Sequence, residues 1–299
     1  MRNYLSFDFG GTFIKYALVQ ENAAISSENK VPTPSSLEGL FVLVTDVIYD
    51  FESETFIEGI AISCPGTITQ RGEIQGSSAI PYLYDIALKD LLEERTAKRV
   101  SIENDANCAA LAELWKGTAN GCHEAAVVVI GTGIGGAIIR NGRLYRGSNL
   151  YGGEFGYGIL YADPKNKQVE TWSQLGSTSS LIRKVAEEKG MKAYDLSGEL
   201  IFEWAEKGDE TCIHAIEEFY FILAVGIHNL QHVYDPELIL LGGGISERED
   251  FVTSLMEKVE EVQALMDLHS IVPTIRTCKF KNQANVIGAV YHFLLSHNN

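Results

Sequence analysis

Two glycine-rich segments hold the residues of this chain that are best suited to chemistry. They are residues 8–12 (Asp-Phe-Gly-Gly-Thr) and residues 131–136 (Gly-Thr-Gly-Ile-Gly-Gly). Each reads as a strand, a tight glycine turn and a second strand. Because glycine has no Cβ atom, the backbone N–H groups of such turns can close on phosphate oxygens. Two turns of this kind predict a nucleotide held between two related halves of the protein.

The second segment also fits the Gly-x-Gly-x-x-Gly pattern of dinucleotide-binding folds through Gly131, Gly133 and Gly136. In that fold the glycine turn must open into a helix. Here residues 137–140 are followed by Asn141-Gly142 and then residues 143–145, which read as a strand, a hairpin turn and a strand. This order of expected elements, a strand, a turn and a strand, favours a phosphate-binding hairpin. A nicotinamide dehydrogenase and ordinary hairpin glycines are the alternatives.

Asp105 is a candidate acidic residue of the site. It follows Glu103 and Asn104, where a buried strand is expected to end and a helix to begin. This position would expose its carboxylate at a cleft, beside helical N–H groups. The alternative is that Asp105 is only the N-cap of that helix. Asp8 ends the first strand and faces the same cleft, and its carboxylate suits a hard cation such as Mg²⁺.

The elements that must position these residues follow from hydrophobic periodicity and turn signals. In the first half we expect strands at 4–9, 14–19, 59–63 and 100–103, with helices at 37–49, 86–95 and 105–115. The small and polar stretch 117–121 predicts a crossing into a second domain. There we expect a strand at 125–130, the glycine hairpin, helices at 177–189 and 210–232, a strand at 238–241 and a last helix at 286–295.

Composition describes an ordinary globular protein, with 45% hydrophobic and 21% charged residues in 299, enough for two domains. The net charge of −16 argues against nucleic acid and membrane surfaces as partners. The five cysteines are widely separated, which is typical of small buried side chains in a reducing compartment. With no visible signal peptide, we expect a cytoplasmic protein.

Five motifs in register resemble the ROK family of sugar kinases and repressors. They are Asp8-x-Gly10-Gly11-Thr12-x-x-Lys15, Glu103-Asn104-Asp105, residues 131–136, Gly153-Glu154-x-Gly156 and residues 242–246. The resemblance spans nearly the whole chain. It implies an α/β, two-lobed, actin/hexokinase-like (ribonuclease H-like) ATPase fold with the active site in the cleft between the lobes. The lobes would be residues 1–117, completed by a C-terminal helix at 286–299, and residues 118–285.

The same resemblance implies roles for single residues. Asp105 would be the general base, and Asp8 would hold Mg²⁺ through water. MgATP would be bound by Asp8, Gly10, Gly11, Thr12, Lys15, Gly131, Thr132, Gly133, Gly243 and Gly244. For Lys15, a solvated strand residue is the alternative. The sugar would be bound by Gly66, Asn104, Asp105, Glu154, Tyr157 and Ser173.

Two departures from the family pattern set further expectations. Many members bind zinc through a histidine after the Glu-x-Gly motif and a nearby cysteine cluster, but Tyr157 stands in place of the histidine and residues 161–180 contain no cysteine. We therefore expect no zinc. Tyr157, Ser173 and Ala79 also leave fewer polar groups at the anomeric end of the sugar. The nearby aromatic residues could stack on a second ring or belong to the core: Tyr82, Tyr84, Tyr151, Tyr157 and Trp172.

These features predict an ATP-dependent kinase of a primary, 6-position hydroxyl, similar to the zinc-lacking β-glucoside kinases, with cellobiose or gentiobiose as first-choice acceptors. Glucokinase and N-acetylmannosamine kinase are the alternatives within the family. A non-catalytic sugar-responsive regulator is the alternative of another class, although the residues ahead of Asp8 are too few for a DNA-binding helix-turn-helix. A homodimer is the default expectation.

Overall fold

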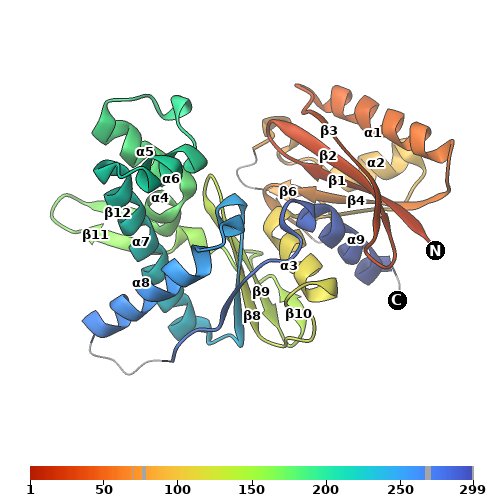
Figure 1. Cartoon of the computed structure of the whole chain (residues 1–299). Helices are drawn as coiled ribbons and strands as arrows, with labels where there is room; N and C mark the ends of the chain where they lie inside the picture. Colours follow the sequence, from red (N-terminus) through yellow and green to blue (C-terminus); the bar gives the residue numbers. More distant parts are fainter. Residues whose placement is uncertain (70, 76–78, 267–270, 298–299) are drawn as a thin grey trace. The chain divides into compact units, whose positions relative to one another are not determined.

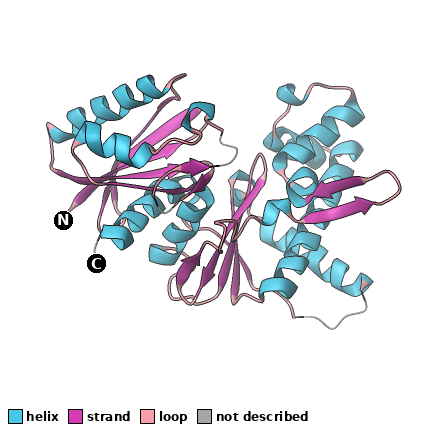
Figure 2. Ribbon diagram, turned by 180° about the vertical axis from the view of Figure 1, so that it is seen from behind, coloured by secondary structure: helices cyan, strands magenta, loops and turns pink. Residues whose placement is uncertain are grey.

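The computed structural model describes residues 1–69, 71–75, 79–266 and 271–297. The chain divides into two compact units, each built from a sheet with helices packed on it (Figures 1 and 2). Unit 1 comprises residues 1–120, 146–152 and 282–299, and unit 2 comprises residues 121–145 and 153–281. The division after residue 120 lies near the crossing expected at 117–121. The short segment 146–152, which we expected in the second domain, belongs instead to unit 1.

Unit 1 contains a mixed sheet in the order β3-β2-β1-β4-β7. Its strands are β1 (Asn3–Phe9), β2 (Phe13–Gln20), β3 (Ile25–Pro32), β4 (Ile57–Cys64) and β7 (Val100–Asn104). The pairs β1–β2 and β2–β3 are antiparallel, whereas the pairs β1–β4 and β4–β7 are parallel. The short strands β5 (Thr67–Ile68) and β6 (Ile74–Gln75) form a separate pair.

Both faces of this sheet are buried because side chains alternate along each strand. On one face, Leu5 and Phe7 pack in a core with helices α1 (Leu37–Glu52) and α2 (Leu88–Thr96). On the other, Tyr4 packs with helices α3 (Asp105–Lys116) and α9 (Ala284–His297). The C-terminal helix therefore completes the first unit, as expected.

Unit 2 repeats the same strand order, β10-β9-β8-β13-β14. Its strands are β8 (Ala125–Ile130), β9 (Ile134–Arg140), β10 (Arg143–Tyr145), β13 (Leu238–Gly242) and β14 (Ile275–Thr277). Its helices are α4 (Trp172–Gly176), α5 (Thr178–Lys189), α6 (Gly198–Glu206), α7 (Glu210–Tyr234) and α8 (Phe251–Leu265). A separate hairpin is formed by β11 (Ile159–Asp163) and β12 (Gln168–Thr171). The two glycine turns thus join the first two strands of two sheets with the same order.

The hairpin expected after Gly136 is confirmed, and it removes the dinucleotide-binding alternative. The chain leaves the glycine turn as β9, not as a helix, and β9 pairs antiparallel with β10. Asn141 and Gly142 connect them with φ values of 53° and 67°. Positive φ at both central residues is the geometry of a tight hairpin turn.

Helix α7 is long and apolar enough to cross a membrane by length and composition alone. However, 50% of its apolar window is buried within the protein. Phe219, Leu223 and Ile227 lie in the core of unit 2, at the helical spacing expected from the sequence. We conclude that α7 is the central core helix of this unit.

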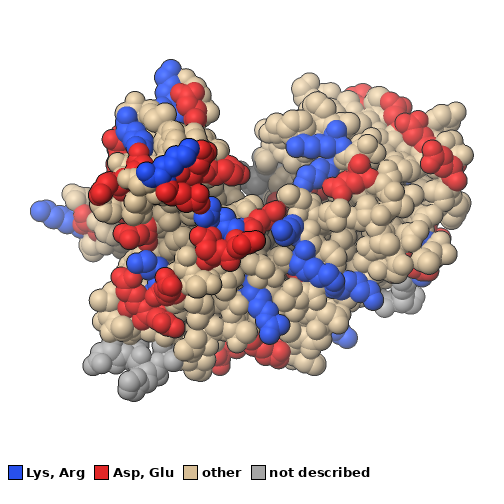
Figure 3. Space-filling model, viewed as in Figure 1, with Lys and Arg blue, Asp and Glu red and all other residues tan. Residues whose placement is uncertain are grey.

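The surface carries charges of both signs. On the face drawn in Figure 3, acidic and basic side chains lie interspersed. The ion pairs of the surface include Lys184 with Glu218 and Arg95 with Glu38. Such exposed pairs contribute only about 0–1 kcal/mol each to stability, so the cores above must supply most of it.

Candidate active site

Asp8 is held in place by two donors within unit 1. Its Oδ1 atom accepts hydrogen bonds from Ser63 Oγ at 2.9 Å and from Asn285 Nδ2 at 3.0 Å. Ser63 lies on the neighbouring strand β4, and Asn285 lies in the first turn of α9. The second carboxylate oxygen has no donor among the described residues, so it is available to a cation or to a water bound by one. Sequence reasoning did not find Asn285, which is 277 residues away along the chain.

Asp105 does not cap helix α3, so the N-cap alternative is wrong. The cap is Asn104, whose side chain accepts a hydrogen bond from the backbone N–H of Asn107 at 3.1 Å. Asp105 is the first helical residue, and its Oδ1 accepts from Ala106 N at 2.8 Å and from Asn104 Nδ2 at 2.9 Å. These donors fix the carboxylate at the positive end of the helix, where negative charge is stabilised.

Asn104 also joins Gly66 to this cluster. Its Nδ2 donates to the Gly66 carbonyl at 3.1 Å, and Gly66 adopts φ 110°, a conformation that favours glycine. Three of the residues expected on the sugar side, Gly66, Asn104 and Asp105, therefore lie together at the carboxyl ends of β4 and β7. The Asn104 amide orients Asp105 as well as being a candidate sugar contact.

Glu103 is a further residue whose structural role sequence reasoning missed. It is only 2% exposed, and its Oε2 is bound by Arg146 through Nε at 3.0 Å and through Nη2. Its Oε1 accepts from the backbone of Asn104 at 2.9 Å and from Asn107 Nδ2 at 3.0 Å. Burial alone would raise the pKa of Glu103, but His292, Arg146 and these hydrogen bonds outweigh it and lower the pKa. The ionised Glu103 thus anchors the start of α3 and the segment 146–152.

The first glycine turn is closed by backbone contacts. Gly10 N donates to Phe13 O at 3.0 Å, and a Cβ atom on Gly10 would lie 2.7 Å from that oxygen. Thr12 is exposed, and Lys15 donates to Asn282 O at 3.3 Å. The turn therefore requires glycine at residue 10, while the phosphate contacts expected from Gly10, Gly11, Thr12 and Lys15 stay predictions.

The second glycine turn, in unit 2, is hydrogen-bonded to the start of helix α5. Gly131 N donates to Gly133 O, and Gly131 O accepts from Thr178 N at the start of α5, both at 2.9 Å. A Cβ atom on Gly131 would meet nothing within 4 Å, so its backbone is open on that side. The turn and the positive end of α5 together form a surface suited to phosphate oxygens.

The hydroxyl of Ser173 is hydrogen-bonded to the backbone next to this turn. Its hydroxyl accepts from Ile134 N at 2.8 Å and donates to Ile134 O at 3.2 Å. A Cβ atom on Gly156 would lie 2.3 Å from Ser173 Oγ, so glycine is required there. The hydroxyl is engaged by the backbone, and the sugar contact expected from Ser173 stays a prediction.

Glu154 is a half-buried acid without a partner. Burial raises the pKa of Glu154, and no donor reaches its carboxylate among the described residues. Tyr157 follows three residues later and is 68% exposed. Of the aromatic residues that could stack on a sugar, Trp172 belongs to the core of unit 2, whereas Tyr84, Tyr151 and Tyr157 are exposed. Tyr82 is half-buried, and its hydroxyl donates to Pro34 O at 2.7 Å.

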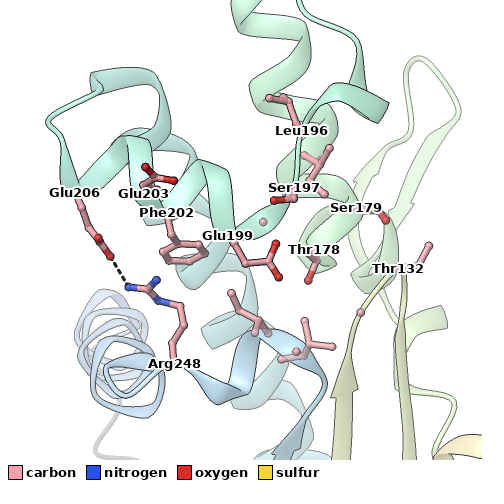
Figure 4. A pocket seen from close by; sticks show the side chains of 16 residues that line it. Thr132, Thr178, Ser179, Leu196, Ser197, Glu199, Phe202, Glu203, Glu206 and Arg248 are labelled. Carbon is pink, nitrogen blue, oxygen red and sulfur yellow. Dashed lines mark hydrogen bonds and ion pairs between the residues drawn. The ribbon is translucent and has the colours of Figure 1, made fainter. Parts of the chain in front are cut away.

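A cavity of about 520 Å³ opens in unit 2 beside the second glycine turn (Figure 4). It is lined by Gly131 and Thr132, by the N-terminal residues of α5 and α6, and by Gly244 and Ile245. Arg248 forms an ion pair with Glu206 at 3.2 Å, and its guanidinium lies 4.1 Å from the centre of the Phe202 ring. The cavity joins an apolar wall to helix N-termini, as a nucleoside phosphate requires.

The α5 and α6 residues of this cavity were not predicted as site residues. The available signal was the pair of serine N-caps, Ser177 and Ser197, which place two helix N-termini in the same unit.

Gly243 and Gly244, which were predicted as nucleotide-binding residues, differ in their surroundings. Gly243 has φ 91°, and a Cβ atom there would lie 2.0 Å from Ile130 O, whereas a Cβ atom on Gly244 would meet nothing within 4 Å.

Two sheets of the same strand order, each with a glycine hairpin between its first strands, define the two-lobed actin/hexokinase-like class of ATPase fold. The model of the ROK family matches residues 4–295. Beta-glucoside kinases of Listeria monocytogenes and Klebsiella pneumoniae are 36% and 35% identical to this chain. The first match covers 98% of both chains, and the second covers 96% of this chain and 95% of the relative.

A ROK family protein from Streptococcus pneumoniae, solved in complex with sucrose, has a TM-score of 0.90 and 37% identity, with 99% of both chains covered. The chain belongs to the ROK family, and within it to the ATP-dependent sugar kinases.

Proposed function

We propose that this protein is a β-glucoside kinase, which transfers the γ-phosphoryl group of ATP to the 6-hydroxyl of a β-glucoside such as cellobiose or gentiobiose. The observation that carries the proposal is the full-length similarity to β-glucoside kinases at 36% identity. The contacts that fix Asp105 support it, as do the half-buried carboxylate of Glu154 and the cavity beside Gly131. A symmetric homodimer in the cytoplasm stays a prediction.

In the proposed reaction, Asp105 accepts the proton of the sugar 6-hydroxyl as that oxygen attacks the γ-phosphorus. The bond from phosphorus to the bridging oxygen breaks, and ADP leaves with its electron pair. Such transfers depend on positioning and charge neutralisation. Mg²⁺ would neutralise charge on the phosphates, and the free oxygen of Asp8 fits it, through water. The cavity of unit 2 would hold the adenosine, with Gly131, Thr132 and Gly133 near the phosphates.

On the sugar side, we propose that Asn104 and Asp105 hold the hydroxyls near the reacting end and that Glu154 holds hydroxyls nearer the anomeric end. A half-buried carboxylate without a donor is suited to accept hydrogen bonds from a diol. Tyr157 and Tyr151 are exposed and could cover a second ring or an aglycone. Trp172 is excluded from that role because it is 3% exposed and packed in the core.

The acceptor preference gives the first prediction. Because Tyr157, Ser173 and Ala79 offer few free polar groups to an anomeric hydroxyl, a substituent there should carry little penalty. Stacking on an exposed tyrosine should then add about 1 kcal/mol, or roughly fivefold in kcat/KM. We expect cellobiose to exceed glucose in kcat/KM at saturating MgATP. A tenfold preference for glucose or N-acetylmannosamine would identify one of the alternative kinases, and no turnover of any sugar would favour the regulator.

The second prediction concerns zinc. Tyr157 supplies no imidazole, and the described residues bring no three His, Cys, Asp or Glu side chains together. Structural zinc requires four such ligands. We expect elemental analysis of the purified, undialysed protein to find well below one zinc per chain, and chelators to leave the melting temperature unchanged. One tightly held zinc per chain would contradict this assignment.

A further inference from the structure

A second cavity lies in unit 1 beside β7, the edge strand of the sheet, and is lined by residues of β5, α2, β7 and α9. Its volume is about 350 Å³, and all of its lining residues belong to unit 1. Ser101 and Glu103 reach it from the same face of the strand, because side chains of a strand alternate. Volumes of about 300–1,000 Å³ are usual for small-molecule sites. The cavity is separate from the one beside Gly131.

Two buried polar atoms in this lining lack partners. Ser101 Oγ and His292 Nδ1 are buried, and neither has a hydrogen-bond partner among the described residues. Ser101 is only 4% exposed. A buried polar atom that stays unsatisfied costs about 1–3 kcal/mol, and in native proteins its partner is often an ion or a water. Both atoms therefore indicate an occupant of the cavity.

The charge of the lining indicates which kind of occupant. Lys89, Arg146, His292 and His297 line the cavity, and Glu103 is the acid among its described residues. Both Glu103 oxygens already accept hydrogen bonds, and Arg146 balances its charge. Lys89 has no acidic partner in the described part of the chain. The lining thus carries a net positive charge when His292 and His297 are neutral.

The pKa of His292 is affected by the same positive charges. Burial lowers the pKa of its imidazole; Glu103 opposes this effect, and the charges of Arg146, His297 and Lys89 add to it. Its Nε2 already lies 3.7 Å from Glu103 Oε2 and 3.3 Å from Ser296 Oγ. A hydrogen bond between the unpartnered Nδ1 and an oxyanion requires a proton, which either the imidazole ring or the anion must carry.

We propose that this cavity binds a small phosphate anion, either orthophosphate or the phosphoryl group of a sugar phosphate. Its oxygens would accept from Lys89, from Ser101 and from Arg146, whose guanidinium has five N–H donors of which Glu103 takes two. Hydrogen bonds between charged groups are roughly twice as strong as neutral ones. A neutral ligand would leave the charge of Lys89 unbalanced.

Equilibrium dialysis of the intact protein tests this site without requiring turnover. Orthophosphate and glucose 6-phosphate are measured separately, and the tighter ligand identifies the source of the phosphoryl group. We expect Lys89→Gln to weaken binding about tenfold or more, the loss of one charged hydrogen bond. Ser101→Ala should weaken it about fivefold. Lys89→Arg should retain binding, and Lys165→Gln, an exposed lysine in the β11–β12 turn, is the matched control.

Two results would overturn the proposal. One is the absence of saturable binding of both anions to the wild type. The other is binding that both Lys89→Gln and Ser101→Ala leave unchanged, which would place the anion elsewhere, such as beside Gly131. Melting temperatures without phosphate verify that each variant is folded. The same concentration of orthophosphate should raise the melting temperature of the wild type more than that of Lys89→Gln, because the stabilisation grows with the ratio of ligand concentration to Kd.

Discussion

We expect Asp105→Asn to lower kcat by about 10²–10⁴-fold, the usual loss when a general base is removed. Asparagine keeps the shape of the side chain, and its oxygen can still accept from Ala106 N and Asn104 Nδ2, so the fold should be preserved. The KM for the sugar should change much less, because the amide can still bond a hydroxyl. Steady-state kinetics with cellobiose and MgATP measure both constants.

Asn104→Ala is the matched control for stability at the same helix terminus. It removes the N-cap of α3, which typically costs about 1 kcal/mol. Chemical denaturation should therefore show a larger loss for Asn104→Ala than for Asp105→Asn, which removes only a charge at the helix terminus. If Asp105→Asn turned over sugar at a near wild-type rate, Asp105 would not be the base.

In unit 2, where we propose that the nucleotide binds, the largest expected effect follows from a change at Gly243. Its φ of 91° and a Cβ contact of 2.0 Å with Ile130 O exclude an alanine without movement of β8 or β13. Backbone strain of this kind costs about 1–3 kcal/mol, and the collision adds to it. We expect Gly243→Ala to lower the free energy of unfolding by about 2 kcal/mol or more and to raise the KM for ATP.

Gly244→Ala is the control beside it. A methyl group at that residue meets nothing within 4 Å and lines the cavity, so stability should change by no more than about 0.5 kcal/mol. Chemical denaturation of both variants makes the comparison. Equal losses of stability would show that the turn tolerates a side chain at Gly243.

The fold could be predicted largely from local patterns. The hairpin strands at both ends of the glycine turns, the serine cap of α5 and the long apolar stripe of α7 each arise from residues close in sequence. Helices α6 and α8 were not predicted, although α6 has a serine N-cap at Ser197 and α8 has apolar residues at helical spacing, so the local signals were present there. The segment 146–152, expected with residues 118–285, lies in unit 1, and the contact that attaches it, Arg146 to Glu103, joins residues 43 apart.

The site residues also comprise some that stand in short sequence motifs and others that only tertiary packing brings to the site. Asp8, Asp105 and the glycines stand in short motifs, so the resemblance of those motifs to the ROK family made them candidates. The residues that hold them in place lie outside these motifs. Asn285 contacts Asp8 from the last helix, and Ser173 contacts Ile134, 39 residues away. Ser173 shows the limit most clearly, because a motif position could predict a sugar contact but not that a backbone turn engages its hydroxyl. Tertiary packing decides such contacts, and a sequence pattern does not encode them.

Product analysis tests the central claim most directly. Purified protein is incubated with MgATP and cellobiose, and the product is examined by phosphorus NMR and mass spectrometry. We predict one ADP formed per sugar phosphorylated, with the phosphorus coupled to the 6-methylene protons of the non-reducing glucose. Failure to consume ATP with cellobiose, gentiobiose, glucose, fructose, mannose or N-acetylmannosamine, or a phosphate on another carbon, would contradict the account.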